Sequence, residues 1–462
     1  MSTDKQYLLQ LDAEHVVHWV TPVGQNAGRI FTHSKGVSLF DSDGEELLDG
    51  SSQLVCVSLG YDYNDEIAEA ASEQLKKLPY MTTFWGLTSD VLIHFTERLL
   101  KFMPEGLSHF CFTNGGSEST ELSFQLARLF WKRNDAGGKY KIISLHNSYH
   151  GTSFGASSAT GVFKGMFSSG YTPLVPGFIK APSYYCYRCM LDLKYPSCGI
   201  QCAKQVEKLI ETEGADTIAA FIAEPEHGTA GDIPPPPEYW PMLREICDKH
   251  NILLIADEVM TGFGRTGKAF CVDHWDVKPD MITMGKGIVS SYIPFGGVAL
   301  NEKMWNGLKG AVIPGATYSG HPVAAAVANK VLEIYEREDI FQNVMEMGEY
   351  AMKRLNKQFL PLPFVGEISG KGLMIGIEIV EDKETRKGYD PASGKMSKIR
   401  ELALEKGLHI RVTDQSWSPS NRISFGPPLI SNKEQIDKML DILYSVLTSL
   451  FLGTDNAKLA GE

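Results

Sequence analysis

Short apolar runs alternate with amphipathic segments through the middle of this 462-residue chain. The apolar runs predict six strands, at residues 109–113, 141–145, 219–223, 252–256, 281–284 and 297–300. The segments between them include predicted helices at residues 117–133, 203–212 and 238–250. This alternation favours an α/β fold in which helices cover both faces of a mainly parallel sheet. In such a sheet, ligands collect at the carboxyl ends of the strands.

The two ends of the chain have a different pattern. Residues 37–49 predict a hairpin that turns at Asp43-Gly44. The C-terminal third predicts long helices and short strands, at residues 324–337, 341–358, 372–379 and 422–424. We therefore expect both termini to build a smaller α+β domain. Residues 1–60 would contribute to this domain and to the wall of the site, 61–325 would form the large domain, and 326–462 would complete the small domain.

Charge and composition narrow the range of partners. The net charge of −12 argues against nucleic acid and anionic membranes as main partners. No apolar run approaches the length that spans a bilayer. The residues after Met1 lack the apolar core of a secretory signal, so eight cysteines predict reduced thiols in a cytoplasmic protein.

Four cysteines stand close together in the sequence, Cys186, Cys189, Cys198 and Cys202. A structural zinc site is conceivable from this spacing. The second pair is not the usual C-x2-C knuckle, so the favoured interpretation is a loop with buried thiols, and no metal site is predicted.

Two charged residues follow neighbouring predicted strands. Asp257 ends one apolar run, and Lys286 lies between two glycines after the next. A lysine there can form a Schiff base with an aldehyde cofactor, and the carboxylate can keep the pyridine nitrogen of that cofactor protonated. This is the chemistry of pyridoxal 5′-phosphate (PLP). The alternative is a buried salt bridge that closes two strand ends.

Other strand ends carry groups that suit the same cofactor. Gly116 and Ser117 open a predicted helix, where free N–H groups bind phosphate, although an ordinary helix cap has the same pattern. Tyr149 could stack on a flat ring, or be a partly buried loop tyrosine. Glu224 could accept hydrogen bonds at the base of the site, or cap a loop. Thr317 could reach a phosphate, or cap the next helix.

In combination these motifs resemble the class III (ω-amino) aminotransferases of PLP fold type I. The matching segments are Gly115-Gly-Ser-Glu118, Ser148-Tyr-His-Gly151, Glu224-Pro225, Leu254-Ile-Ala-Asp-Glu-Val259, Thr261-Gly-Phe-Gly-Arg-Thr-Gly267, Gly285-Lys-Gly287 and Thr317-Tyr-Ser-Gly320. The resemblance covers nearly the whole chain.

The resemblance implies a role for each matching residue. Lys286 would form the Schiff base and shuttle the proton, and Asp257 would pair with the pyridinium nitrogen. Val259 would pack on the ring face opposite Tyr149.

The resemblance also implies how the phosphate is held. Gly116 and Ser117 would bind it, and Thr317 would reach the phosphate of a neighbouring subunit. The active unit would therefore be a homodimer or a dimer-based tetramer with shared sites.

The substrate side is implied by fewer matches. Arg411 matches the arginine that binds a substrate carboxylate in many members of the family. Without that resemblance, the sequence would suggest a surface arginine at the end of a strand. Thr229 stands where related enzymes commonly have a glutamate, and Val55 where they often have a tryptophan. Phe84 and Trp85 are expected to supply the aromatic wall, with core packing as the alternative.

The expected activity is that of an ω-aminotransferase. The donor would be an amine or ω-amino acid, with taurine or β-alanine as candidates, and the acceptor would be pyruvate or 2-oxoglutarate. Two alternatives stay open: an aminomutase or racemase of the same fold, and a non-catalytic PLP-fold binding protein.

Overall fold

The computed structural model describes residues 4–25, 28–163 and 170–453. Its larger part is built on one seven-stranded sheet with the order β4-β10-β9-β8-β7-β5-β6. The strands in that order are β4 (Leu107–Thr113), β10 (Gly296–Asn301), β9 (Met281–Met284), β8 (Leu253–Asp257), β7 (Ile218–Ala223), β5 (Lys141–Leu145) and β6 (Phe178–Ala181). Strand β10 is antiparallel to both neighbours, and the other adjacent strands are parallel. The predicted mainly parallel sheet is confirmed.

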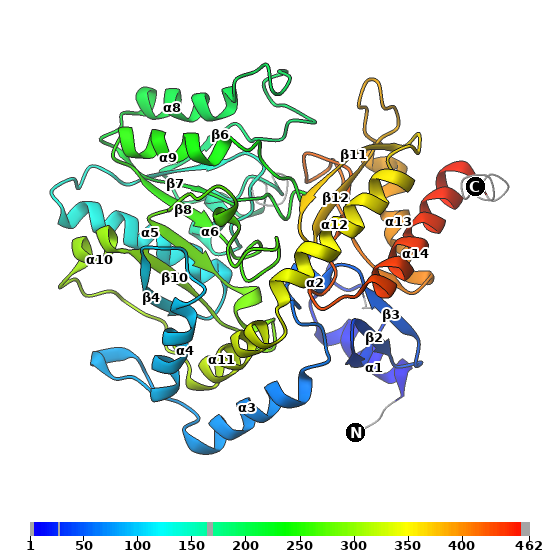
Figure 1. Ribbon diagram of the computed structural model, residues 1–462, viewed down its shortest axis with the longest axis horizontal. Helices are drawn as coiled ribbons and strands as arrows, with labels where there is room; N and C mark the ends of the chain where they lie inside the picture. Colours follow the sequence, from blue (N-terminus) through cyan, green and yellow to red (C-terminus); the bar gives the residue numbers. More distant parts are fainter. Residues whose placement is uncertain (1–3, 26–27, 164–169, 454–462) are drawn as a thin grey trace.

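Every residue of β7, β8 and β9 is buried, as expected for parallel strands covered on both faces. Side chains alternate between the two faces. Phe221 shares a core with the helix α9 (Tyr239–Lys249), whereas Ile222 shares another with the helix α5 (Gly116–Arg133). Figure 1 shows α9 on one side of the sheet and α5 on the other. The sheet is therefore the centre of a three-layer structure.

Further helices complete the large part: α3 (Asn64–Lys77), α4 (Asp90–Leu100), α6 (Phe154–Ala159), α8 (Gln201–Glu213), α10 (Glu302–Leu308) and α11 (Pro322–Arg337). Helix α11 packs against α3 and α4. The predicted domain boundary between residues 325 and 326 falls inside α11, and the boundaries stay a prediction.

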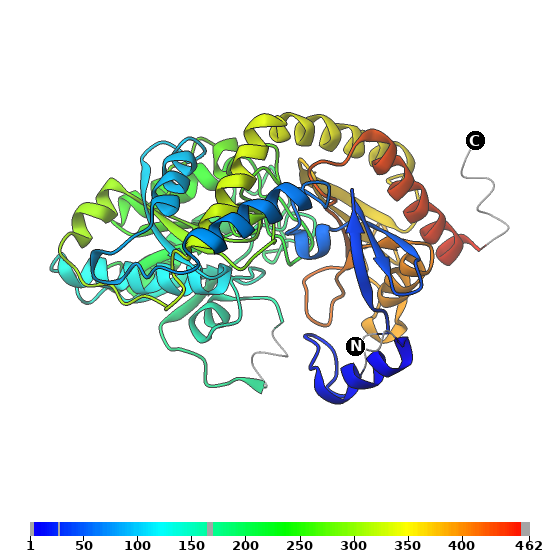
Figure 2. The ribbon, with the colours of Figure 1, turned by 90° about the horizontal axis from the view of Figure 1, so that it is seen from below.

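The two ends of the chain meet in the smaller part. One sheet contains β1 (Phe31–Lys35), β2 (Ser38–Asp41), β3 (Glu46–Asp49) and β13 (Leu408–His409). Strand β13 pairs in parallel with β3, so an N-terminal hairpin and a C-terminal strand share one sheet. Figure 2 shows the blue N-terminal strands beside the orange and red C-terminal elements. The predicted α+β domain from both termini is confirmed.

A second small sheet is antiparallel throughout. Its strands are β11 (Val365–Lys371), β12 (Met374–Ile379), β15 (Arg422–Phe425) and β14 (Arg411–Val412). The other helices of this part are α1 (Lys5–His15), α2 (Ser52–Val55), α12 (Ile340–Gln358), α13 (Lys395–Glu405) and α14 (Lys433–Leu452). Within the described residues, no helix is long and apolar enough to cross a membrane.

Candidate active site

The carboxyl ends of β8 and β9 bring Asp257 and Lys286 to one edge of the large sheet. Asp257 is the last residue of β8 and lies in register with Thr283 of β9. The Thr283 hydroxyl donates to Asp257 Oδ1 over 2.9 Å. Lys286 begins the short 3-10 helix η3 (Lys286–Val289), two residues beyond β9, with a positive φ of 43°. A lysine backbone seldom adopts this conformation, which marks a constrained position.

The Asp257 carboxylate is only 3% exposed, yet it is fully engaged. His150 Nδ1 lies 2.7 Å from Oδ2, and the Val259 backbone N–H donates to Oδ1 over 3.2 Å. Donors on both oxygens stabilise a charged carboxylate in a buried setting. His150 is itself 3% exposed, and the contact requires its proton on Nδ1. His150 was not among the predicted site residues, although it follows Tyr149 in the matching segment Ser148-Tyr-His-Gly151.

The Lys286 side chain lies within the electrostatic reach of several charged groups. Burial lowers the pKa of its amine, and the positive charge of Arg411 lowers it further. The thiol of Cys56 and the carboxylates of Asp257 and Glu224 act in the opposite direction. A lowered pKa provides more of the neutral amine, which is the nucleophilic form. Cys56 is a neighbour of Lys286 that sequence reasoning missed.

The first turn of α5 forms a cradle beside this lysine. A Cβ atom on Gly116 would lie 2.6 Å from Val259 Cγ1, so only glycine fits there. One on Gly151 would lie 2.5 Å from Ser117 Oγ. The backbone N–H groups of a first turn have no partner inside the helix and bind anions. Gly116, Ser117 and Val259 are thus brought together within packing distance of Gly285, the residue before the lysine.

Glu224 and Tyr149 lie at the ends of neighbouring strands on the same edge. The Tyr149 backbone N–H donates to both Glu224 oxygens over 3.4 Å. Burial raises the pKa of Glu224 to about 8. Its Oε2 also lies 3.2 Å from His227 Nδ1, and burial lowers the pKa of that imidazole to about 3. The Tyr149 ring meets Phe163 edge-on with centroids 6.1 Å apart, and its stacking on a cofactor stays a prediction.

Arg411 lies on β14, on the side of the site formed by the small part. Its backbone N–H donates to Ser51 Oγ over 2.8 Å, and Nη2 lies 3.5 Å from the Gly228 carbonyl oxygen. The charge of Arg411 acts on Lys286, as described above. By contrast, Val55 is 2% exposed and packs against Gly426. A Cβ atom added to Gly426 would lie 3.7 Å from Val55 Cγ2. A role for Val55 in a substrate wall stays a prediction.

The structure places Phe84 and Trp85 in the short 3-10 helix η1 (Phe84–Gly86) and Thr317 in a turn, outside this cluster. Trp85 is 89% exposed and its ring centroid lies 5.8 Å from that of Phe84. Thr317 is exposed, and its carbonyl oxygen accepts from the Tyr80 hydroxyl over 2.9 Å. Among the described residues, neither a hydrogen bond nor a ring contact joins these three side chains to Asp257 or Lys286.

A cavity of about 650 Å³ lies between these segments and the sheet. Phe110, Thr113 and Glu118 line one wall, and Ile313 and Gly315 line the other. Neither Lys286 nor Asp257 lines it, so its size alone does not locate the chemistry. Glu118 ties the cavity to the α5 cradle because it belongs to the same first turn.

The four clustered cysteines line one small cavity of about 20 Å³. All four are free thiols. Burial raises the pKa of Cys186 to about 12 and that of Cys202 to about 11, and the neighbouring cysteines add to the rise. These two thiols are therefore protonated near neutral pH.

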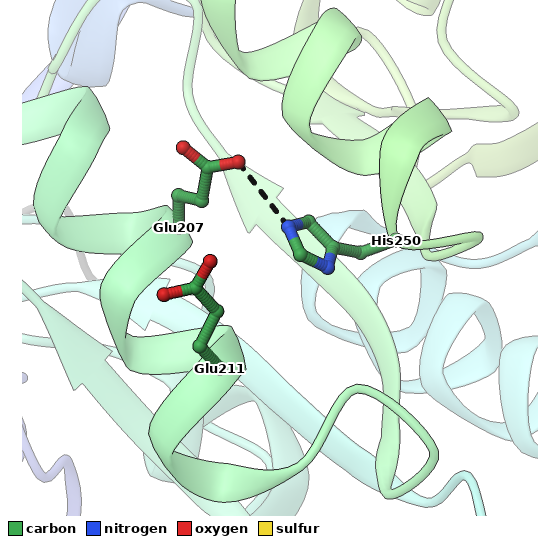
Figure 3. A group of neighbouring side chains, drawn as sticks. All are labelled: Glu207, Glu211 and His250. Carbon is green, nitrogen blue, oxygen red and sulfur yellow. Dashed lines mark hydrogen bonds and ion pairs between the residues drawn. The ribbon is translucent and has the colours of Figure 1, made fainter.

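Another group of possible metal ligands lies on the surface of α8 and at the end of α9 (Figure 3). Its members are Glu207, Glu211 and His250. Glu207 Oε1 already accepts from Lys249 Nζ over 2.8 Å and contacts His250 Nε2 at 3.2 Å. These contacts form a surface ion-pair network. Apart from the spacing of the three side chains, no observation among the described residues points to a bound metal ion.

The sheet is that of a PLP enzyme of fold type I, and Asp257, Lys286 and the first turn of α5 meet at the carboxyl ends of its strands. The sequence model of the class III aminotransferase family matches residues 21–447. The chain belongs to this family and is a PLP-dependent transaminase, as its motifs predicted.

Individual relatives are similar over nearly their full lengths. The putrescine–pyruvate aminotransferase of Pseudomonas aeruginosa is 35% identical, over 91% of this chain and 90% of its own. The taurine–pyruvate aminotransferase of Bilophila wadsworthia is 33% identical, over 95% of this chain and 96% of its own. Among solved structures, an amine transaminase from an uncultivated Pseudomonas species, described in its PLP-bound form, has a TM-score of 0.88. It is 34% identical, over 94% of this chain and 98% of its own.

Proposed function

We propose that the protein is an ω-aminotransferase that moves the amino group of an amine or ω-amino acid to a 2-oxo acid. The observation that supports this most is the position of Arg411, whose charge acts on Lys286 across the site. A guanidinium forms a planar fork to carboxylate or sulfonate. An anionic substrate group on Arg411 would therefore lie near the amine that performs the chemistry.

When bound, PLP supplies an aldehyde and an electron-withdrawing pyridine ring. Lys286 contributes the amine that holds the cofactor and then moves a proton to and from the substrate carbon. Asp257, which His150 and Thr283 hold in place, would accept a hydrogen bond from the protonated ring nitrogen. The first turn of α5, with the hydroxyl of Ser117, binds the phosphate.

A transaminase binds an amino donor and then a 2-oxo acid in the same site, and this requirement suggests the class of donor. Taurine and β-alanine carry an anionic group that Arg411 would bind, and so do the acceptors pyruvate and 2-oxoglutarate. The names of the two relatives above cover both a sulfonate donor and a diamine donor, each with pyruvate. We place both kinds of donor within the range of this protein.

The active unit in this proposal is a homodimer in which Thr317 reaches the phosphate of the neighbouring subunit. Large apolar side chains near Thr317 support this arrangement, since Trp85 is 89%, Val312 92% and Tyr318 60% exposed. Exposed apolar groups in one region mark an interaction surface. Sedimentation of the PLP-loaded protein would give the mass of a dimer or tetramer, and a monomer with full activity would contradict it.

The activity is tested with a panel of donors: taurine, β-alanine, putrescine and alanine. Each is incubated with the PLP-loaded protein, with and without pyruvate or 2-oxoglutarate, and the carbonyl product is quantified. An aminotransferase releases product in amounts that follow the acceptor. Turnover of a single substrate without any acceptor would instead identify an aminomutase or racemase.

A further inference from the structure

Asp232 is a further buried carboxylate near Arg411, and its side chain has no hydrogen-bond partner among the described residues. After β7 the chain folds back on itself, and His227 pairs with Ile233 as an antiparallel bridge. Asp232 lies in the turn that this bridge closes, with a positive φ of 57° and 0% exposure. Neither of its carboxyl oxygens hydrogen-bonds to a protein atom in the described ranges. Such a group is costly unless something compensates its charge.

Arg411 and Asp232 converge on one backbone carbonyl. The Asp232 N–H donates to the Gly228 oxygen over 3.2 Å, and Arg411 Nη2 approaches the same oxygen at 3.5 Å. Arg411 also lies directly opposite Ser424 in the antiparallel pair of β14 and β15, so both side chains point to one face of that sheet. The Ser424 hydroxyl is buried near Asp232, but the two side chains do not form a hydrogen bond.

Arg411 also has donor capacity that the described residues leave unused. Its Nη1 is buried and contacts no hydrogen-bond acceptor among them. The two other arginines that act on Asp232 are engaged at both terminal nitrogens. Arg422 binds Glu367 and Ser369, and Arg265 binds three further protein oxygens.

Charge effects agree with this geometry. Burial raises the pKa of Asp232, and Arg411 is foremost among the neighbours that lower it. The Asp232 carboxylate and the Arg411 guanidinium thus influence each other inside a region of low dielectric constant, where such interactions are strong.

We propose that Asp232 is the internal counter-ion of Arg411, and that it lets one site accept both carboxylate substrates and amines that lack a carboxylate. This inference rests on the proposed aminotransferase function. With an amine donor, Asp232 compensates the charge of Arg411. With a 2-oxo acid, the substrate carboxylate compensates the charge of Arg411 instead. Asp232 is a positioning residue for specificity and takes no part in the bond-making steps.

The test is the PLP-loaded Asp232→Asn protein. Asparagine tolerates the positive φ and keeps the shape, so the substitution removes the charge alone. We expect kcat/KM for butylamine, which has no carboxylate, to fall roughly tenfold. The Kd of unreactive propanoate should fall roughly tenfold, because Arg411 is then uncompensated, while kcat/KM for alanine is kept or rises. A merely structural role would instead lower both kcat/KM values and raise the Kd of propanoate.

Two further variants sharpen the result. Glu226 is also a buried carboxyl whose oxygens have no hydrogen-bond partner among the described residues, and burial raises its pKa well above the ordinary value. Glu226→Gln should leave the ratio of amine to alanine turnover unchanged. In an Arg411→Met background, Asp232→Asn should no longer shift that ratio, because the charge that it compensates is absent.

The outcomes separate the two proposals. If the unaltered protein binds PLP but transaminates none of the donors, the proposed function fails. If it transaminates them and Asp232→Asn changes amine, alanine and propanoate equally or not at all, the counter-ion role alone is overturned. A split that persists without Arg411 would also overturn it.

Discussion

His150 Nδ1 lies 2.7 Å from Asp257 Oδ2, and both residues are 3% exposed. The contact joins the loop after β5 to the end of β8, two strands away in the sheet. It fixes the orientation of the carboxylate that we propose as the partner of the cofactor's ring nitrogen. His150 is thus expected to affect the chemistry of the site through Asp257.

Replacing His150 with phenylalanine keeps the size of the ring and removes the donor. A lost hydrogen bond to a charged group costs about 1.5–3 kcal/mol, so we expect PLP affinity or kcat to fall roughly 10- to 100-fold. Titration of PLP absorbance and steady-state rates measure both. His109→Phe is the matched control, because His109 stacks on Trp305 at the amino end of β4. Unchanged values for His150→Phe would remove it from the site.

A methyl group at Gly116 should damage the phosphate cradle. The Cβ would lie 2.6 Å from Val259 Cγ1, so the overpacked variant Gly116→Ala should lose about 1–3 kcal/mol of stability and bind PLP more weakly. The second substitution Val259→Ala should restore part of both losses. Gly137→Ala is the control, since its Cβ would meet no atom closer than 4.0 Å. Equal Tm values and PLP affinities for the two single variants would contradict the packing argument.

Glu224 should make stability depend on pH. Its pKa is about 8 in the folded chain because of burial, against an ordinary 4.5, so the unfolded chain ionises first as pH rises. The stabilising contribution is complete below pH 4.5 and is lost as pH rises to about 8. Glu224→Gln cannot ionise and should gain stability relative to the unaltered protein across this window, by about 1.4 kcal/mol per pH unit at most. Urea unfolding of the PLP-free proteins measures this. The exposed Glu69→Gln variant is the control, and a constant difference across the window would refute the prediction.

Arg411→Ala should separate substrate binding from cofactor binding. Without the guanidinium, kcat/KM for the 2-oxo acid should fall roughly 100-fold, while the Kd of PLP stays within about twofold. The exposed Arg400 on α13 provides a matched substitution of the same residue type. Acceptor kinetics that survive Arg411→Ala would exclude this arginine from the pocket.

The fold was predictable where each strand carries its own signal. Strands β7, β8 and β9 are continuous apolar runs, and their predicted limits differ from the observed ones by one residue or less. The edge strand β6 (Phe178–Ala181) was missed, because three of its four residues are only partly buried and its sequence shows no contiguous apolar run. Strand β1 is mostly exposed and polar, and it was missed for the same reason.

The candidate site was predictable where a residue type at a strand end implies its own chemistry, as for Asp257 and Lys286. Contacts between distant segments were not. His150 meets Asp257 across 107 positions, and Cys56 is among the groups that shift the pKa of Lys286. The neighbourhood of Asp232 and Arg411 likewise depends on how the small sheets lie against the large one.

The absorption spectrum of the purified protein tests the central claim most directly. The protein with PLP should show a visible band that disappears when an amino donor is added alone and returns when a 2-oxo acid follows. Lys286→Ala should abolish this cycle and lower the rate by roughly 1,000-fold or more. Lys278→Ala, a substitution of an exposed lysine paired with Glu105, should leave it intact. A protein that takes up no PLP, or whose band ignores every donor in the panel, would contradict the account.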